Sequence, residues 1–338
     1  MVTTVAYVGP VGSQPRLPGD DEELMMKAWV ATGSTGEPLA MAEVPEPVPG
    51  PGEVLVGVQA YSVNRGEMFF LNGVYGTPAQ AGWRPGQDIA GTVIQSAPDG
   101  SGPAIGARVV GHPEQAGWAE RTVVPVSRLA ILPDGLPDTA AAALPLAGLT
   151  ALRLARAAGN LAGRRILLTG ASGGVGHYLT ELAAGNGAQV TAVTSSAGRG
   201  GRLAELGAEA VVLDAGDAAG PFDVIMESVG GKTFATALTK LAPGGTVLWY
   251  GQAGLEPPVL DFFALFPVTP VTITHFANWV SDTTDAQDLA VLVRLAATGR
   301  LHPEIGRTAD WTQTTAVLDD LYRRRIRGNA VLTIPAHS

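Results

Sequence analysis

The spacing of apolar residues changes near residue 138 and divides the chain into two kinds of segment. Before this point, short runs of alternating apolar and polar residues lie between turns rich in glycine and proline. Such runs predict the strands of an antiparallel barrel of about 120 residues. After it, an alanine- and leucine-rich segment at 139–158 predicts helices. Strands then alternate with helices as far as residue 276, a pattern typical of a parallel sheet.

The individual elements follow from this pattern. In the first part, strands are expected at 26–30, 53–60, 88–95, 108–111 and 117–124. In the second part, short apolar runs predict buried parallel strands at 166–169, 188–194, 223–226, 246–249 and 271–274. Amphipathic patterns predict helices at 232–241, 287–298 and 312–325, and alternation predicts a last strand at 330–334.

The chain is therefore predicted to be an α/β protein with two domains. Residues 26–145 and 277–338 would form the barrel, and the inserted residues 146–276 would form a doubly wound domain. Residues 1–25 are expected to form a tail or a loosely held strand, because much of this stretch is glycine, proline and acidic residues.

A glycine-rich turn lies between the first strand and the first helix of the inserted domain. It carries Ala171-x-Gly173-x-x-Gly176, which is the dinucleotide-binding fingerprint with alanine in place of its first glycine. Gly173 would let the backbone approach a pyrophosphate at the positive end of the helix, and Gly176 would let the helix pack close to the strand. We therefore predict nucleotide binding; a purely structural tight turn is the alternative. The residues assigned to the cofactor here are Ala171, Ser172, Gly173, Gly174, Val175 and Gly176.

The end of the next strand indicates which nucleotide is bound. Folds that prefer NAD place an acidic residue there for the ribose 2′-hydroxyl. This chain instead has Thr194, Ser195 and Ser196, followed by Arg199 and Arg202, and its next acidic residue is Glu205. Hydroxyl groups and guanidinium forks suit a 2′-phosphate, so these residues favour NADPH over NADH. The alternative is a solvated helix start with surface arginines.

Composition narrows the class of protein. Of 338 residues, 46% are hydrophobic, which is ample for a large core, and the formal net charge of −9 argues against a nucleic-acid partner. The absence of cysteine excludes disulfides and thiolate metal sites, and a cytoplasmic location is the simplest expectation. No apolar run is long enough to span a bilayer, and no secretory signal is expected at the start.

Six stretches in order carry a family resemblance. They are 62–67, 85–93, 117–120, 146–151, 170–176 and 327–332, with the sequences Ser-Val-Asn-Arg-Gly-Glu, Pro-Gly-Gln-Asp-Ile-Ala-Gly-Thr-Val, Gly-Trp-Ala-Glu, Leu-Ala-Gly-Leu-Thr-Ala, Gly-Ala-Ser-Gly-Gly-Val-Gly and Arg-Gly-Asn-Ala-Val-Leu. Together they resemble the medium-chain dehydrogenase/reductase superfamily, in its zinc-free quinone oxidoreductase and enoyl reductase branch. The resemblance covers 26–334 and implies a GroES-like antiparallel β-barrel domain plus a doubly wound Rossmann domain.

The chain departs from the zinc alcohol dehydrogenases at the metal positions. Asn64 stands near the first ligand position, Gln87 and Asp88 stand at the second, and the four cysteines of a structural zinc are missing. This set would not make a competent zinc site, so no metal is expected. Without a Lewis acid, reduction of a quinone or a conjugated C=C is favoured over alcohol–ketone interconversion, because the accepting carbon is already electrophilic.

The resemblance also implies which residues line the cleft. Asn64, Glu67 and Tyr75 would lie near the nicotinamide, Asn64 bonding the cofactor or a substrate carbonyl and Tyr75 donating to the developing enolate. Glu67 stands where aspartate is common. A turn-forming asparagine and an ordinary core or loop tyrosine are the alternatives. The remaining positions assigned to the cofactor are Thr150, Gly251, Phe276 and Asn329, the last standing where lysine is usual.

Other polar residues are expected to be structural. Asp88 would order the barrel wall, and His112 would be a structural or solvated histidine in a loop. His177 would pack beside the cofactor without acid–base work, and the arginine run at 323–327 would be a solvated helix face.

The sequence thus predicts an NADPH-dependent, zinc-independent oxidoreductase that reduces quinones or α,β-unsaturated carbonyl compounds by hydride transfer. A tailoring reductase of one specific biosynthetic intermediate and a non-catalytic NADPH-binding regulatory protein are the alternatives, because fold alone does not fix function. The expected partner is a small-molecule substrate, with no nucleic acid and no membrane. The resemblance implies a homodimer formed through the edge of the inserted sheet.

Overall fold

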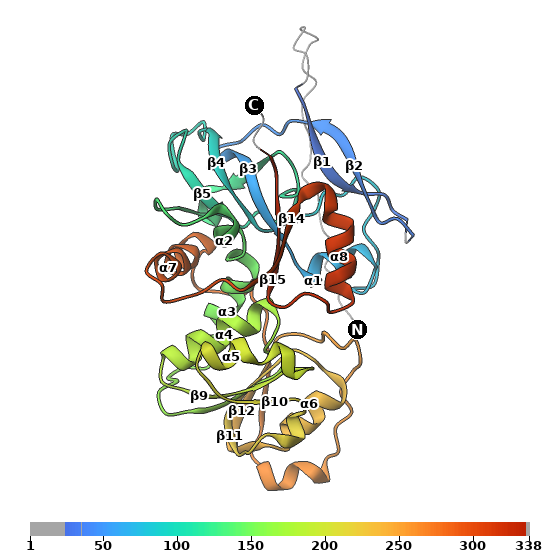
Figure 1. Ribbon diagram of the computed structural model, residues 1–338, viewed down its shortest axis with the longest axis vertical. Coiled ribbons are helices and arrows are strands. Elements are labelled where there is room, and N and C mark those ends of the chain that lie inside the picture. Colours follow the sequence, from blue (N-terminus) through green and yellow to red (C-terminus); the bar gives the residue numbers. More distant parts are fainter. Residues whose placement is uncertain (1–23, 35, 336–338) are drawn as a thin grey trace.

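The computed structural model describes residues 24–34 and 36–335, which form two large sheets at opposite ends of the molecule (Figure 1). One sheet has six strands in the order β10-β9-β8-β11-β12-β13, and every neighbouring pair is parallel. Its strands are β8 (Arg165–Leu168), β9 (Gln189–Val193), β10 (Ala208–Val212), β11 (Phe222–Glu227), β12 (Leu241–Trp249) and β13 (Thr272–His275). The order reverses between β8 and β11, which makes this a doubly wound sheet.

The second sheet has seven strands and is antiparallel except for one parallel pair, β14 with β15. Its order is β14-β15-β3-β4-β5-β7, and β6 pairs with β3. The strands are β3 (Glu53–Val63), β4 (Ile89–Gln95), β5 (Arg108–Gly111), β6 (Arg121–Pro125), β7 (Leu129–Ile131), β14 (Ile305–Asp310) and β15 (Asn329–Thr333). Strands β1 (Met25–Ala31) and β2 (Leu39–Pro45) form a separate antiparallel pair. The predicted return of the last strand to the barrel is therefore confirmed.

The helices pack on both sheets; α8, for example, lies against β14 and β15 of the barrel sheet. They are α1 (Arg65–Leu71), α2 (Asp138–Ala142), α3 (Pro145–Ala157), α4 (Gly174–Gly185), α5 (Gly201–Glu205), α6 (Gly231–Leu238), α7 (Asp285–Ala297) and α8 (Thr314–Tyr322). Short 3₁₀ turns are η1 (Val126–Arg128), η2 (Ala197–Arg199), η3 (Ala215–Asp217), η4 (Phe263–Val268) and η5 (Trp311–Gln313). No helix within the described ranges is both long and apolar enough to cross a membrane.

Helix α3 lies between the two sheets and joins their cores (Figure 1). The largest cluster of buried apolar residues runs from the barrel through α3 to the parallel sheet, and it includes Ala60, Val110, Leu149, Ile166 and Val190. Helix α3 also packs against α4 and α7. Because a continuous core is buried here, α3 fixes how the two sheets lie relative to one another.

The predicted α/β fold with a GroES-like barrel and a Rossmann sheet is confirmed. Strands β2, β7, β10 and β14 were not predicted; they are short, half exposed or polar, and their long-range partners are invisible in the local pattern. The strand predicted at 117–124 begins only at Arg121, because Gly117 and Trp118 instead donate their N–H groups to the backbone of 85–86. The predicted tail at 1–25 lies outside the described residues apart from its last two, and the predicted domain boundaries stay predictions.

Candidate active site

The glycine-rich turn follows β8 and leads directly into α4. Gly170 has φ +61°, the left-handed region that favours glycine, and a Cβ there would lie 2.6 Å from Ser228 Oγ. The tight turn therefore depends on Gly170, which explains why the fingerprint tolerates alanine at the next position. Ala171 is fully buried, and its N–H donates to Val193 O at the end of β9.

The two glycines of the fingerprint do different work. A Cβ on Gly176 would lie less than 3.0 Å from the carbonyl oxygen of Ala171, so only glycine lets α4 pack this close to the turn. A Cβ on Gly173 would meet Gly170 O only at 3.4 Å, and the side in front of it is otherwise open. No side chain caps α4, so the N–H groups of its first turn remain available to an anion.

Hydroxyl and guanidinium groups lie beyond the end of β9. Thr194 is buried with Oγ1 unpartnered, while Ser195 and Ser196 are exposed. Arg199 donates to the carbonyl oxygen of Arg324, and burial together with the charges of Arg324 and Arg327 lowers the pKa of Arg199. Neighbouring arginines that lower each other's pKa create a strongly positive potential, which suits a doubly charged anion.

Acidic residues neutralise the other arginines near this cluster. Arg202 pairs with Glu304 and Glu205, and Arg327 pairs with Glu304. The expectation that 323–327 forms a solvated helix face is wrong, because α8 ends at Tyr322 and the run continues as a turn toward the nucleotide side. The distance in sequence, more than 120 residues from Arg199, hid this contact from sequence analysis.

The carboxyl ends of β8, β11, β12 and β13 meet at one edge of the sheet. Buried Glu227 accepts from Thr169 Oγ1 at 3.1 Å and from the N–H groups of Val229 and Gly230 at 2.9 and 3.1 Å. Burial raises the pKa of this carboxyl group. Ser228 is held by Thr169 and lies against Gly251, so the predicted Gly251 belongs to this edge.

Phe276 lies at the same edge. Its N–H donates to Trp249 O at 2.8 Å, and its side chain is half buried against the main core. Ligands of open α/β sheets bind at this edge, outside the carboxyl ends of the strands.

On the barrel, the buried carboxylate of Asp88 holds several polar groups in place. Asp88 is fully buried; its Oδ2 accepts from Ser62 Oγ at 2.5 Å and from Asn64 Nδ2 at 2.8 Å. Its Oδ1 accepts from the N–H of Leu146 at 2.8 Å, at the start of α3. The expected structural role of Asp88 is consistent with this geometry, and the contact also fixes the Asn64 side chain.

His112 belongs to the same network, although sequence analysis placed it in a loop as an isolated residue. It is buried directly after β5, with Nδ1 2.8 Å from Gln87 O and 3.3 Å from Asp88 Oδ1. Two oxygen neighbours at Nδ1 require a proton there. The signal was absent from the sequence because Gln87 and His112 are 25 residues apart and meet only through the pairing of β4 with β5.

Glu67 and Tyr75 lie close to Asn64 but in different environments. Glu67 is buried in α1, and its carboxyl group accepts from the N–H groups of Asn64 at 2.8 Å and Gln87 at 3.0 Å. Burial and the nearby Asp88 charge raise the pKa of Glu67 to about 8. Tyr75 is 65% exposed and packs edge-on against Phe69 of α1, with its ring centroid 6.0 Å away. The structure thus brings Asn64 and Glu67 together and leaves Tyr75 at the surface beside them.

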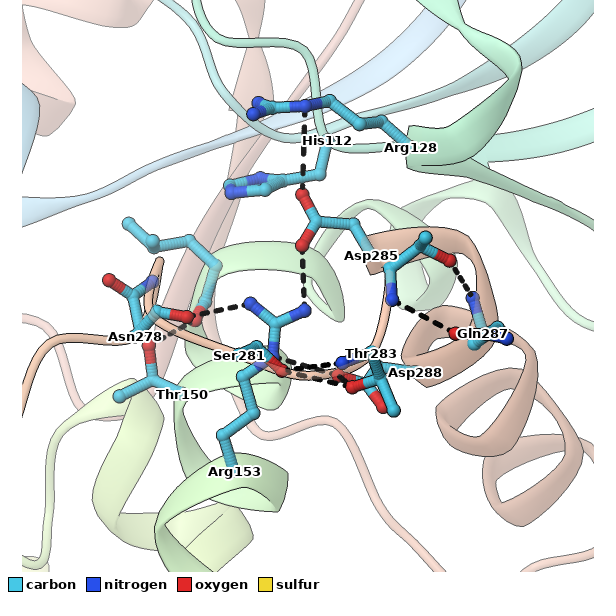
Figure 2. Close-up of polar contacts among 12 residues, drawn as sticks. His112, Arg128, Thr150, Arg153, Asn278, Ser281, Thr283, Asp285, Gln287 and Asp288 are labelled. Atoms are coloured by element: carbon cyan, nitrogen blue, oxygen red, sulfur yellow. Dashed lines mark hydrogen bonds and ion pairs between the residues drawn. The ribbon is translucent and has the colours of Figure 1, made fainter.

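The side chains of Thr150 and Asn329 both donate hydrogen bonds to backbone carbonyl groups. Thr150 is nearly buried in α3, and its hydroxyl donates to Leu146 O at 2.7 Å (Figure 2). Asn329 Nδ2 donates to Glu304 O at 3.1 Å, and its Oδ1 occupies the space where Gly174 would carry a Cβ. Next to it, Gly328 N–H donates to Ser172 O at 3.0 Å, so the closing strand touches the glycine-rich turn directly.

His177 also borders the turn. It is buried in the first turn of α4, with Nδ1 2.9 Å from Gly173 O and Nε2 unpartnered. Burial lowers the pKa of His177, which keeps its ring neutral. Among residues 24–34 and 36–335, no three histidine, aspartate or glutamate side chains are grouped as metal ligands.

Comparison with protein families matches both halves of this arrangement. The alcohol dehydrogenase GroES-like domain family matches residues 50–134, and the zinc-binding dehydrogenase family matches residues 174–296. Acryloyl-coenzyme A reductase of Sulfurisphaera tokodaii is 27% identical over 84% of this chain and 92% of its own length. The polyketide synthase protein NorB of Streptomyces orinoci is 30% identical over 99% of this chain, but the chain spans only 16% of that protein.

Solved structures show the same fold. Mycobacterial Rv1454c complexed with NADPH aligns with a TM-score of 0.81 and 27% identity, covering 91% of this chain and 99% of that one. The quinone oxidoreductase of Pseudomonas syringae pv. tomato DC3000 aligns with a TM-score of 0.81 and 25% identity, covering 91% and 100%. With both domains matched in order, the chain belongs to the medium-chain dehydrogenase/reductase superfamily of oxidoreductases, in its quinone oxidoreductase-like branch.

Proposed function

We propose that the chain is an NADPH-dependent, zinc-independent reductase of quinones or α,β-unsaturated carbonyl compounds. The observation that carries this proposal is the uncapped start of α4 beside the Arg199–Arg324 pair, with the Asn64–Asp88 network on the opposite side of the cleft. Relatives named for quinone reduction and for acryloyl-coenzyme A reduction support this substrate class.

The residues present fit NADPH. The first-turn N–H groups of α4 would hold the pyrophosphate, and the room in front of Gly173 admits it. Thr194 Oγ1, which is buried without a partner, and the Arg199 guanidinium would hold the ribose that carries the 2′-phosphate. When bound, the cofactor supplies a hydride.

The barrel side would orient the reacting groups. Asn64 Nδ2 is committed to Asp88 and the Asn64 side chain accepts from the N–H of Glu67 in the capping box of α1, so the second lone pair of Oδ1 is what Asn64 would offer to a ligand. A carbonyl oxygen accepts hydrogen bonds, so Asn64 suits a hydroxyl or amide donor on the cofactor better than a substrate carbonyl. Tyr75 retains an unbonded hydroxyl group and is our candidate donor to the substrate carbonyl oxygen, where negative charge develops as the conjugated system is reduced.

The activity is tested by mixing the purified chain with NADPH and a panel of quinones, enones and enoyl thioesters. We expect loss of the near-ultraviolet absorbance of the reduced cofactor with at least one class, and a tenfold or greater weakening in Tyr75→Phe if Tyr75 donates to the substrate. Turnover restricted to a single complex intermediate would favour a tailoring reductase. NADPH binding without turnover of any class would favour a regulatory protein and contradict the proposal.

We also propose that the chain forms a homodimer through the edge of the parallel sheet. All four residues of the edge strand β13 are exposed, and its unpaired side offers backbone groups to another strand. Nearby, Phe262, Phe263 and Phe266 pack on one another with ring centroids 5.4–5.6 Å apart while remaining 59–72% exposed. An exposed apolar patch of this kind marks an interface.

This interface has a direct test. Sedimentation of the full chain should give twice the monomer mass, and the double variant Phe262→Asp, Phe263→Asp should sediment as a monomer. Ile94→Asp, an exposed apolar residue on the barrel, serves as the matched control and should leave the dimer intact. A monomeric wild type would contradict the proposal.

A further inference from the structure

A buried arginine on α3 joins three elements that are far apart in sequence. Arg153 is 7% exposed, and each of its guanidinium nitrogens has a partner (Figure 2). Nε donates to Asp288 at 2.7 Å, Nη2 to Asp285 at 2.7 Å, and Nη1 to the carbonyl oxygen of Asn278 at 2.7 Å. The first two partners lie on α7, and the third lies in the segment that connects β13 to α7.

The charges of this cluster are balanced and its geometry is fixed. Fully buried Asp288 also accepts from Arg156 Nη1 at 2.5 Å and from Thr283 Oγ1 at 2.9 Å. Asp285 lies between Arg153 and Arg128, whose Nε is 4.0 Å from it. A guanidinium that makes three directional bonds to different elements leaves little freedom for any of them.

The 276–283 segment depends on this arginine. Among the described residues, 277–282 is joined to another element by a hydrogen bond only through Arg153 and Asn278 O. Its large apolar side chains do not anchor it, since Trp279 is 79% exposed and Val280 is 73% exposed. The two ends are held at Phe276, by Trp249 O, and at Thr283, by Asp288.

The segment begins at the ligand-binding edge of the sheet, directly after β13. Thr150, which the family position assigns to the nicotinamide, lies three residues before Arg153 and therefore on the same face of α3. Figure 2 shows Asn278 on the same side of the Arg153 guanidinium as Thr150. The opposite end of the helix is held by Asp88 through the N–H of Leu146.

We propose that Arg153 is a positioning residue, which fixes the 276–283 segment against Thr150 and so forms the wall that orients the nicotinamide ring. This inference rests on the proposed function, because it assumes that NADPH occupies the cleft. Arg153 does not touch the reacting atoms; it acts through the backbone of Asn278 and through Asp285 and Asp288.

The test compares Arg153→Met and Arg153→Lys with the control Arg156→Met. Both methionine variants remove one guanidinium from Asp288, but Arg156 is exposed and does not contact Asn278. We expect kcat to fall about 10- to 100-fold in both Arg153 variants, because a displacement of about 1 Å at a reacting centre has an effect of that size. KM for NADPH should change less than about threefold, because the adenosine end is unaffected.

Controls separate positioning from general loss of structure. Arg156→Met, which removes a partly exposed guanidinium from the same Asp288, should lower the thermal midpoint less than Arg153→Met and leave kcat within about twofold of wild type. Free guanidinium ion, added well below denaturing concentrations, should partly restore kcat in Arg153→Ala but not in Arg156→Ala. Equal kcat values in the Arg153→Met and Arg156→Met variants, or full activity of Arg153→Lys, would overturn the inference.

Failure of the proposed function can be distinguished from failure of the positioning role of Arg153. If the wild type turns over no substrate, the readout becomes fluorescence of bound NADPH, which reports how the nicotinamide ring is held. Enhancement in the wild type and in Arg156→Met that is lost in Arg153→Met would still support the positioning role. The same enhancement in all three proteins, or no NADPH binding at all, would overturn it.

Discussion

The surroundings of the glycine-rich turn and the Asp88 network differ in how their polar groups are satisfied. On the nucleotide side, α4 has no capping side chain, and Thr194 Oγ1 and Arg327 Nε are buried without partners. Around Asp88, each carboxylate oxygen accepts at least two hydrogen bonds or close contacts, so the network is complete. Because an unpaired buried donor is unfavourable, the first region gains most from a ligand, whereas the second is organised before any ligand arrives.

The largest expected effect on stability comes from breaking the hydrogen-bond network around Asp88. Asp88→Ala removes the acceptor for Ser62, Asn64 and Leu146 and leaves their donors buried. We expect a loss of about 3–5 kcal/mol in the free energy of unfolding, measured by urea denaturation. Ser62→Ala, which removes one donor from the same carboxylate, should cost about 1 kcal/mol. A loss below about 1 kcal/mol in Asp88→Ala would contradict the role of Asp88 as the organising group.

The next largest effect should appear around the glycine-rich turn, in the affinity for NADPH rather than in the free energy of unfolding. Arg199→Met should weaken NADPH binding about 10- to 100-fold, the effect of one hydrogen bond to a charged group, and leave NADH binding unchanged. Calorimetric titration with both cofactors measures this. Arg202→Met is the control, because Glu304 and Glu205 already neutralise that residue. Equal losses for NADPH and NADH would remove Arg199 from the 2′-phosphate site.

A smaller effect on stability should follow from adding a methyl group at the glycine-rich turn. Gly176→Ala places a methyl group against the Ala171 carbonyl and should destabilise the fold by about 1–3 kcal/mol. Gly185→Ala, in the last turn of the same helix, meets nothing within 4 Å and should stabilise by up to about 1 kcal/mol. Both changes are read from thermal unfolding. Matching effects of the two substitutions would mean that close packing at Gly176 is unimportant.

The smallest effect of a substitution concerns Glu67, whose carboxyl group is buried and has a raised pKa. The folded state holds a proton on Glu67 up to about pH 8, whereas the unfolded chain releases it near pH 4.5. Stability from this group is therefore fully present below about pH 4.5 and is lost as pH rises through about 8. Glu67→Gln should flatten this part of the profile and cost about 1 kcal/mol at low pH, where one backbone donor loses its acceptor. A wild-type profile that rises over this range would contradict the assignment.

Local sequence patterns predicted the elements around the glycine-rich turn well because these elements are contiguous in the sequence. Strand, turn, helix and strand all lie within 165–194, and the spacing of the glycines indicates the geometry of the turn. The sequence analysis gave no separate role to Gly170, the residue before the fingerprint, which has the positive φ.

The barrel side and the Arg153 cluster were predicted only in part, because their contacts cross long stretches of chain. Asn64 and Asp88 were both identified from motifs, but the hydrogen bond between them depends on the pairing of β3 with β4. His112, Asp285 and Asp288 carry no local signal, and the last two reach Arg153 across more than 130 residues. Such partners become visible only when packing has brought their elements together.

The contact between Gly328 and Ser172 restricts how the molecule can open. The last strand of the barrel is hydrogen-bonded to the glycine-rich turn at this point, and Asn329 fills the space left by Gly174. A rotation between the barrel and the parallel sheet would have to break this hydrogen bond or pivot about it, so the contact opposes separation at the pyrophosphate end. Substrate and product would then exchange while the cofactor stays bound at its pyrophosphate end.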